Sequence, residues 1–363
     1  MIKKIQVKNF KCFEEQSIEC RELNLFTGVN GMGKSTLIQT LLMFRQTYER
    51  KGVLQEGNLL LNGHYVSLGT IKDISYWYKK EANIEIMIEE EGQKFECCSN
   101  GDESGLLWNF GDKVDGSSLM GDGFEYISAE RLGPRRYYDE LSGERYSVTQ
   151  VGVKGEYAIS TLYAIGSDFK VYENMKNCAE SSERLELQVN AWMSEISPGI
   201  RVKAIPYLDA NMMGLRYGQS SVMGEESTNA VNMGFGVSYV LPIVIALLKA
   251  KEGDLIILEN PEAHIHPKGQ RQIGELVARA ASNGVQIIME THSDHVLNGI
   301  RLAVKNHIID KEKVKVNYFG VYEEIDGMVK HEMTSPEILE DGSLSNWPDG
   351  FFDEWDKAVD LLF

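Results

Sequence analysis

The sequence predicts an α/β fold with a mixed or parallel central sheet, an antiparallel β-subdomain, a helical insertion and no long coiled coil. Two continuous apolar runs, 255–258 and 285–289, are separated by a helical pattern, which is typical of parallel strands buried on both faces. Polar and apolar residues alternate over residues 2–26, which indicates short strands before a glycine-rich turn. Apolar heptads are not sustained, so no long coiled coil is expected.

In the N-terminal part, the pattern predicts strands, then one helix, then further strands. The helix should begin near Ser35, because apolar side chains follow it at helical spacing, namely Leu37, Leu41, Phe44 and Tyr48. Over residues 59–128, short apolar alternations are separated by turns, which favours an antiparallel β-subdomain. We therefore expect residues 1–155 to form an N-terminal lobe.

The middle of the chain is expected to be helical. Its clearest helix should run from Ser182 to the stop signal at Pro198, with an apolar face that includes Trp192. We expect residues 156–231 to form a helical insertion. Residues 232–363 return to strand–helix alternation and are expected to form a C-terminal lobe, so that the three segments build one discontinuous domain.

Composition excludes several classes of protein. The chain has 363 residues, of which 43% are hydrophobic and 25% charged, which is ordinary for a globular protein. Its net charge of -17 argues against a protein that coats nucleic acid, because such proteins are usually basic. No apolar stretch is long enough to span a membrane and no secretory signal is visible. The five cysteines include no C-x-x-C pair, so we expect reduced thiols in the cytoplasm.

A glycine-rich motif indicates a phosphate site. Residues 28–35 match G-x-x-x-x-G-K-[ST] between the strand expected at 23–27 and the helix that follows. Glycines let backbone amides surround phosphate oxygens, and the helix start adds a favourable partial charge. Lys34 would supply a charge for the β- and γ-phosphates, and the Ser35 hydroxyl a magnesium ligand. The alternative is a glycine-rich turn without a ligand.

The two apolar runs end in polar residues that suit the same site. The first ends at Glu259, and a carboxylate at a strand end beside a P-loop is suited to hold magnesium. The second leads to His292, which could hydrogen-bond the γ-phosphate or the attacking water. Thr291 and Ser293 could equally cap the next helix, and the two roles are compatible.

A further segment carries glycines and a serine before an apolar helix expected at 239–249. Gly234, Gly236 and Ser238 at a helix start would make a second loop that binds anions. The alternative is a flexible loop in which Ser238 is simply the N-cap.

In their order along the chain, namely the P-loop, the segment of Gly234 to Ser238, the strand ending at Glu259 and the strand leading to His292, the motifs resemble the ABC-type ATPase heads of the SMC/RecF group. The chain is most similar to short bacterial AAA ATPases related to the overcoming-lysogenization-defect (OLD) proteins. The likeness covers essentially the whole chain and is carried by "IKKIQVKNFKCFEEQSIE", "LNLFTGVNGMGKST", "YISAERLGPRR", "ENPEAHIHPKGQ" and "WPDGFFDEW". Lys34 and Glu259 are 225 residues apart, which is far more than a compact GTPase places between its two motifs.

The resemblance implies ATP and Mg²⁺ as cofactors and a role for each motif. Walker A would comprise Gly28, Asn30, Gly31, Gly33, Lys34, Ser35 and Thr36. Ser35 and Glu259 would hold the metal, and Glu259, Glu262 and His292 would form the catalytic group. Gly234, Gly236 and Ser238 resemble the signature motif, which in ABC heads caps the γ-phosphate of the opposite protomer.

One position departs from the ABC pattern. These heads usually carry a glutamate directly after the Walker B acid, and here that residue is Asn260, whose amide cannot accept a proton from water. Two alternatives follow. Either Glu262 serves as the base, or hydrolysis is slow and the protein is a nucleotide-gated scaffold with little turnover.

Two further clusters have functional and structural interpretations. Arg131, Arg135 and Arg136 could contact phosphates of DNA or ATP, or belong to a solvated loop. The histidines of "HIHP" and "THSDH" could hold a transition metal, although these segments already have nucleotide roles.

The function expected from the resemblance is an Mg-dependent ATPase that dimerises on binding ATP. Its partner would be an effector such as a nuclease, in bacterial anti-phage defence or DNA repair. We expect a homodimer or higher homo-oligomer and no membrane partner. DNA binding stays open, and the ATP-binding subunit of a transporter is a less favoured alternative, because a clean LSGGQ signature is missing.

Overall fold

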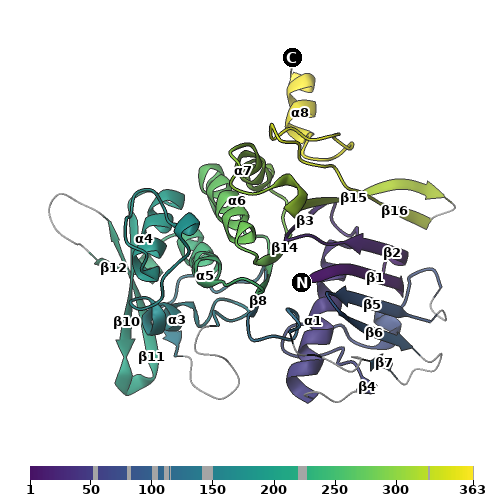
Figure 1. Cartoon of the computed structure of the whole chain (residues 1–363), viewed down its shortest axis with the longest axis horizontal. Helices are drawn as coiled ribbons and strands as arrows, with labels where there is room; N and C mark the ends of the chain where they lie inside the picture. The colour runs from purple at the N-terminus through teal and green to yellow at the C-terminus, as the bar shows by residue number, and fades with distance from the viewer. Residues whose placement is uncertain are drawn as a thin grey trace. The chain divides into compact units, whose positions relative to one another are not determined.

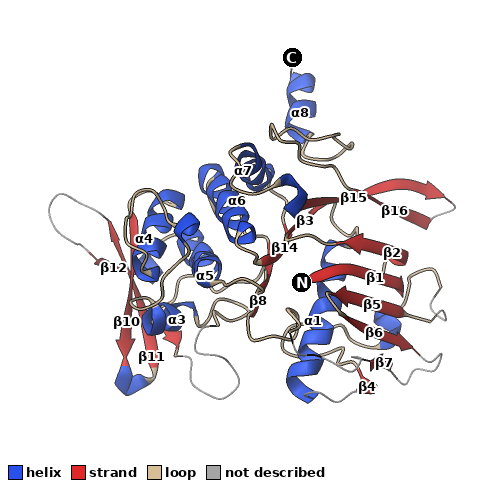
Figure 2. Ribbon diagram, in the orientation of Figure 1, coloured by secondary structure: helices blue, strands red, loops and turns tan. Residues whose placement is uncertain are grey.

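The computed structural model describes most of the chain and divides it into two compact units. The described residues are 1–51, 56–79, 83–99, 105–109, 114, 116–140, 150–219, 227–325 and 328–362. The first unit comprises Met1–Phe124, Glu312–Glu337 and Leu344–Phe363, and the second comprises Glu125–Lys311 and Ile338–Ser343. Figure 1 gives the element labels and Figure 2 the secondary structure.

The first unit contains an antiparallel sheet in the order β2-β1-β5-β6-β7-β4. Its strands are β1 (Ile2–Phe10), β2 (Phe13–Glu19), β4 (Glu56–Asn58), β5 (Glu85–Glu90), β6 (Gln93–Ser99) and β7 (Leu106–Asn109). Ile5 lies opposite Ile88 and both are fully buried, whereas the neighbouring Lys4 lies opposite Glu89 on the other face. This period of two produces a half-buried sheet, and the antiparallel β-subdomain expected from the sequence is confirmed.

The same unit carries the strand and helix that flank the glycine-rich turn. These are β3 (Leu23–Gly28) and α1 (Lys34–Lys51). Strand β15 (Val314–Ile325) runs parallel to β3 and pairs antiparallel with β16 (Met328–Thr334), so this sheet is mixed. Two other helices, α2 (Ile71–Ile74) and α8 (Glu354–Leu362), also lie here. The apolar stripe predicted for α1 is confirmed, because Leu37, Leu41 and Phe44 are fully buried.

The second unit contains the two apolar runs as neighbouring parallel strands. They are β13 (Leu255–Glu259) and β14 (Gln286–Glu290), in a register that places Glu259 beside Glu290. The helices around them are α5 (Phe235–Lys249), α6 (Pro267–Ser282) and α7 (Asp294–Lys305). Strand β8 (Phe124–Ile127) lies beside β13 in the sheet. Parallel neighbours end at the same edge, so the residues that follow β13 and β14 meet. No described helix combines the length and apolar character needed to cross a bilayer.

The segment expected to be a helical insertion is helical only in its first half. It begins with α3 (Ala158–Ile165) and α4 (Leu185–Ile196), and continues with β10 (Ile200–Tyr207), β11 (Met212–Gln219) and β12 (Ser227–Asn229). The short strand β9 (Tyr138–Asp139) also pairs with β11. The second half forms strands because its side chains alternate in burial: Val202, Leu215 and Tyr217 are buried, whereas Arg201 and Lys203 are exposed. The 3₁₀ helices are Glu173–Met175, Leu208–Ala210, Ala230–Asn232 and Lys311–Lys313.

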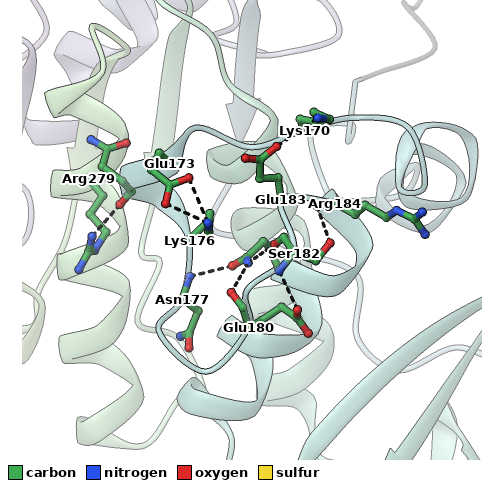
Figure 3. A network of polar contacts seen from close by, with 11 residues as sticks. Lys170, Glu173, Lys176, Asn177, Glu180, Ser182, Glu183, Arg184 and Arg279 are labelled. Atoms are coloured by element: carbon green, nitrogen blue, oxygen red, sulfur yellow. Dashed lines mark hydrogen bonds and ion pairs between the residues drawn. The ribbon is translucent and has the colours of Figure 1, made fainter.

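A polar network fixes the loop between α3 and α4 (Figure 3). The buried side chain of Gln188 accepts a hydrogen bond from the amide of Asn177 at 2.7 Å. Arg279 of α6 donates to the carbonyl oxygen of Asn174 at 2.6 Å, and Lys176 pairs with Glu173 at 2.9 Å. These bonds tie an irregular segment to two helices, so it forms a fixed wall of the second unit.

Candidate functional site

The first unit holds the P-loop in a conformation that only glycine adopts without strain. The φ angles of Gly28, Gly31 and Gly33 are 128°, 80° and 100°. The ammonium of Lys34 donates to the carbonyl oxygens of Gly28 and Val29, each at 2.9 Å, and its side chain is buried. The loop therefore folds around its own lysine at the start of α1, which is the geometry of an anion-binding nest.

Two of these glycines are also required by packing. A Cβ at Gly28 would collide with the backbone of Phe319 on β15. A Cβ at Gly33 would collide with the ring of Phe13 and would lie 2.7 Å from the sulfur of Cys12. The loop is thus pressed against strands on both sides, whereas Gly31 has open space around it.

The remaining Walker A residues differ in how far they are buried. Asn30 is exposed at the loop tip, Ser35 is half-buried in the first turn of the helix, and Thr36 is buried behind it. Burial raises the pKa of the Cys12 thiol to about 11, and a hydrogen bond with the Thr36 side chain partly opposes this shift. Cys12 is therefore a neutral packing group under the P-loop.

The acidic residue Glu259 ends β13 in the second unit. One of its carboxylate oxygens accepts a hydrogen bond from the amide of Ala129 at 3.2 Å. Burial raises the pKa of Glu259, and hydrogen bonds from Ala129 and Tyr126 and the charge of Arg131 oppose that shift. Glu259 is thus a largely buried carboxyl group, and Arg131 is a cation whose charge opposes the cost of that burial.

Asn260, at the departure from the ABC pattern, has left-handed backbone with φ of 44°. Arg131 stabilises this turn: its guanidinium donates to the carbonyl oxygens of Glu259 at 2.7 Å, Asn260 at 2.6 Å and Ser128 at 2.9 Å. Arg131 is buried, and burial lowers its pKa to about 10, so it stays cationic at neutral pH. Arg131 is therefore neither part of a solvated loop nor open to external phosphates: it is buried, its two terminal nitrogens donate to backbone carbonyl oxygens, and its Nε has no partner among the described residues.

Glu262 connects the loops after β13 and β14. Its carboxylate accepts hydrogen bonds from the Thr291 hydroxyl and from the backbone amide of His292, both at 2.7 Å. Ser293 caps α7 by accepting from the amide of Val296 at 3.1 Å, so the capping interpretation of this segment is confirmed. His292 itself is exposed, so its ring remains accessible at the same edge of the sheet as Glu259 and Glu262.

The signature-like segment is the first turn of α5 and not a loop before it. Gly234 is the N-cap and the helix begins at Phe235, so the interpretation of Ser238 as N-cap is wrong. Ser238 is buried and its hydroxyl lies 3.1 Å from that of Tyr217. Gly236 packs against the backbone of His264, leaving no room for a side chain. The part of this turn that reaches solvent is Gly234 and Phe235.

The histidines of this region have structural partners. His266 is the N-cap of α6 and accepts from the amide of Lys268 at 3.3 Å. The His264 ring packs on Tyr239 with centroids 4.9 Å apart. Across the residues that the structure describes, no three His, Cys, Asp or Glu side chains are grouped to hold a metal ion.

The structure thus brings together some predicted residues and leaves others in separate units. Glu262 accepts a hydrogen bond from the amide of His292, and Glu259 ends β13 in register with Glu290 of the neighbouring strand. Gly28 to Thr36 belong to the first unit, so their meeting with Glu259 on one nucleotide stays a prediction. Sequence reasoning missed the carbonyl contacts of Arg131. No local signal marks them, because Arg131 lies four residues after the end of β8 and the acceptors on Glu259 and Asn260 are far away in the sequence.

Three family models match the chain. Residues 1–192, more than half of it, match the family described as "AAA ATPase domain". Residues 209–298 match "AAA domain, putative AbiEii toxin, Type IV TA system", and residues 309–362 match "Protein of unknown function (DUF3696)".

Comparison with individual proteins points to the same fold. A curated relative is the energy-coupling factor transporter ATP-binding protein EcfA2 of Mycoplasma mobile, which is 27% identical over 101 residues, or 27% of this chain and 32% of that protein. The chain therefore matches about a third of the length of that relative. A solved SMC head bound to the C-winged helix domain of ScpA superposes with a TM-score of 0.51 at 13% identity, over 92% of this chain and 97% of that chain. The expected ABC-type head of the SMC/RecF group is confirmed as a fold.

Proposed function

Because the chain belongs to the AAA ATPase domain family, we propose that it binds ATP with Mg²⁺ and hydrolyses it slowly, as an ABC-type head. The observation that carries this proposal is the P-loop, in which three glycines with positive φ wrap the backbone around the Lys34 ammonium at the start of α1. A lysine at a helix start inside a loop of this kind is an anion-binding arrangement, and its chemistry suits a triphosphate.

Each group in the site then has one task. The loop amides and Lys34 bind the β- and γ-phosphates, the Ser35 hydroxyl and Glu259 are the candidate ligands of the metal, and His292 contacts the γ-phosphate or the attacking water. Bound Mg²⁺ would supply charge neutralisation at the phosphates. This requires both units to contribute to one nucleotide, which is part of the proposal.

Slow hydrolysis follows from the surroundings of Glu262. Its two oxygens already accept hydrogen bonds from Thr291 and His292, so the carboxylate acts as a positioning group for the histidine. Asn260 offers no base. The same observations favour the second candidate function, a nucleotide-gated scaffold whose assembly state changes with ATP while turnover is negligible.

ATP-dependent dimerisation is the proposed output. The exposed turn of Gly234 and Phe235 would cap the nucleotide bound at the partner's P-loop, and the 55% exposure of the Phe235 side chain is consistent with an interface. The similar SMC head is bound to a ScpA domain, and one matched family is described as a putative toxin. We therefore propose control of an effector such as a nuclease, in anti-phage defence or DNA repair. The free state of all five cysteines agrees with a cytoplasmic location.

Phosphate release and oligomeric mass test these alternatives. Wild type should release phosphate slowly, and Lys34→Ala should abolish both release and ATP binding. Asn260→Glu should accelerate release if only a base is missing, whereas Asn260→Gln, of matched length, should not. If wild type and all variants are equally inactive but ATP still changes the mass of wild type, the scaffold is the function. If ATP does not bind, both candidates are wrong.

A further inference from the structure

The sheet of β9 to β12 in the second unit has one covered face and one open face. Val202, Leu215 and Tyr217 point to the covered face, where α3 and α4 contact β10 (Figure 1). Alternation places Arg201, Lys203 and Tyr207 of β10, and Arg216 of β11, on the opposite face. Figure 2 shows the hairpin of β10 and β11 at the outer edge of the second unit.

Three cations gather on the open face. Arg201 and Lys203 are two residues apart on β10, and Lys203 lies directly opposite Arg216 on β11. Like charges directly opposite each other destabilise a sheet. Within the described part of the chain, no carboxylate forms an ion pair with any of the three, although the protein as a whole carries a net charge of -17. Local conflict of this kind is typical of a site that an external group completes.

Aromatic rings continue the same face. Tyr207 lies in register with Arg201 and Lys203, and its ring covers Gly214, where a Cβ would lie 2.6 Å from Cε2. Tyr137 packs against Tyr207 with centroids 5.4 Å apart and is 47% exposed. Gly218 has nothing within 4 Å of its Cβ position, so the face is open between the cations.

A groove lies beside β10 and is lined by residues from both faces of the hairpin. It has a volume of about 870 Å³, and Arg201, Lys203 and Arg216 line one wall. The other wall is formed by α4, including Asn190 and Glu195, and by the fixed loop of Figure 3. Glu180, Glu186 and Glu195 balance the three cations inside the groove, so an anion would bind on the open face of the strands and not in the groove.

We propose that this face binds single-stranded nucleic acid, with phosphates along Arg201, Lys203 and Arg216 and a base stacked on the Tyr207–Tyr137 pair. Cations on an open strand face beside exposed rings are the combination that single strands require, because their bases are free to stack. A duplex would satisfy the cations but leave the rings without bases. The site does not depend on the proposed ATPase.

The charge part is tested by fluorescence anisotropy of a labelled oligo(dT) 20-mer on the full chain. Arg201→Ala/Lys203→Ala should weaken binding and reduce the slope of log K against log salt by about 1.4, since each phosphate contact on a single strand contributes roughly 0.7. The matched control, Lys251→Ala/Lys305→Ala, removes two exposed cations elsewhere in the same unit and should leave both quantities unchanged. Lys34→Ala should also bind normally, which separates this site from the nucleotide site.

The stacking part is tested at Tyr207. Tyr207→Ala should weaken binding about tenfold and Tyr207→Phe should not, because stacking needs the ring and not the hydroxyl. Thermal unfolding of each variant shows whether the sheet is intact. No binding of the 20-mer at low salt, equal effects of the two double variants, or stronger binding of a hairpin duplex than of the single strand would each overturn the proposal. Capture of an acidic peptide in place of the oligonucleotide would overturn it in favour of a protein ligand.

Discussion

Glu262 and Thr291 are joined by a hydrogen bond of 2.7 Å, in which the threonine hydroxyl donates to the carboxylate. The other oxygen of Glu262 accepts from the backbone amide of His292. The residue that sequence reasoning named as a candidate base therefore holds the loop that carries the histidine. Its loss should be visible in stability as well as in turnover, which a purely catalytic residue would not show.

Glu262→Ala should be less stable than Glu262→Gln. Alanine removes both acceptors and leaves two donors unpaired, which costs about 2–4 kcal/mol when the lost acceptor is charged. Glutamine keeps one oxygen for the His292 amide, and the Thr291 hydroxyl can accept from its amide group, so we expect a loss of about 1 kcal/mol. Urea unfolding measures both, and equal stability of the two variants would contradict the bonding seen here.

Arg131 should be among the least replaceable residues of the second unit. Arg131→Met removes the donors to the carbonyl oxygens of Ser128, Glu259 and Asn260, and should cost about 3 kcal/mol or more, since buried acceptors are left unpaired. Arg131→Lys keeps the charge but not the planar arrangement of donors, so its stability should lie between those of wild type and Arg131→Met.

Arg136→Met provides the control, because Arg136 is exposed and the same change there should be nearly neutral. Thermal unfolding without nucleotide is the measurement. A similar melting temperature for Arg131→Met and Arg136→Met would show that the carbonyl contacts contribute little.

The sequence predicted the strands and helices whose apolar spacing is regular. β13 and β14 were visible because both faces are buried, and α1 and α4 because one stripe is. The hairpin of β10 and β11 was missed because Pro206, Gly214 and Gly218 interrupt an alternation that Arg201 and Val202 begin. Short strands with such interruptions lose their periodic signal, and only tertiary pairing fixes them.

The site could be predicted as far as its motifs reach. Lys34, Glu259 and His292 were named from strand ends and a glycine pattern, which are local features. The hydrogen bonds of Arg131 could not be predicted, because they join positions 128 and 129 residues apart in the chain. The burial of Ser238 against Tyr217 is likewise a property of the folded unit and not of either segment.

Alanine at the three P-loop glycines should destabilise the first unit to different degrees. Gly28→Ala and Gly33→Ala introduce a collision as well as positive φ, whereas Gly31→Ala introduces positive φ in open space. The backbone term alone costs about 1–2 kcal/mol. We expect Gly31→Ala to lose about that much and the other two clearly more.

Gly31→Ala is therefore the internal control for this series. If all three variants have the same melting temperature, packing of the loop against Phe319 and Phe13 contributes little to stability. Circular dichroism melts without nucleotide report the difference directly, since no ligand then masks the strain.

Glu259→Gln should be more stable than wild type at neutral pH in the absence of metal and nucleotide. Burial raises the pKa of Glu259, so the folded chain holds a proton more readily than the unfolded chain does. The stability that this proton contributes is complete below the unfolded pKa of about 4.3 and is lost as pH rises through the higher folded value. Glutamine is uncharged at every pH, so the variant does not lose this stability.

Melting temperatures of the two proteins from pH 4 to pH 8 measure the effect. They should diverge as pH rises and converge at the acidic end. A difference that widens toward acidic pH would show that the folded state lowers the pKa of Glu259.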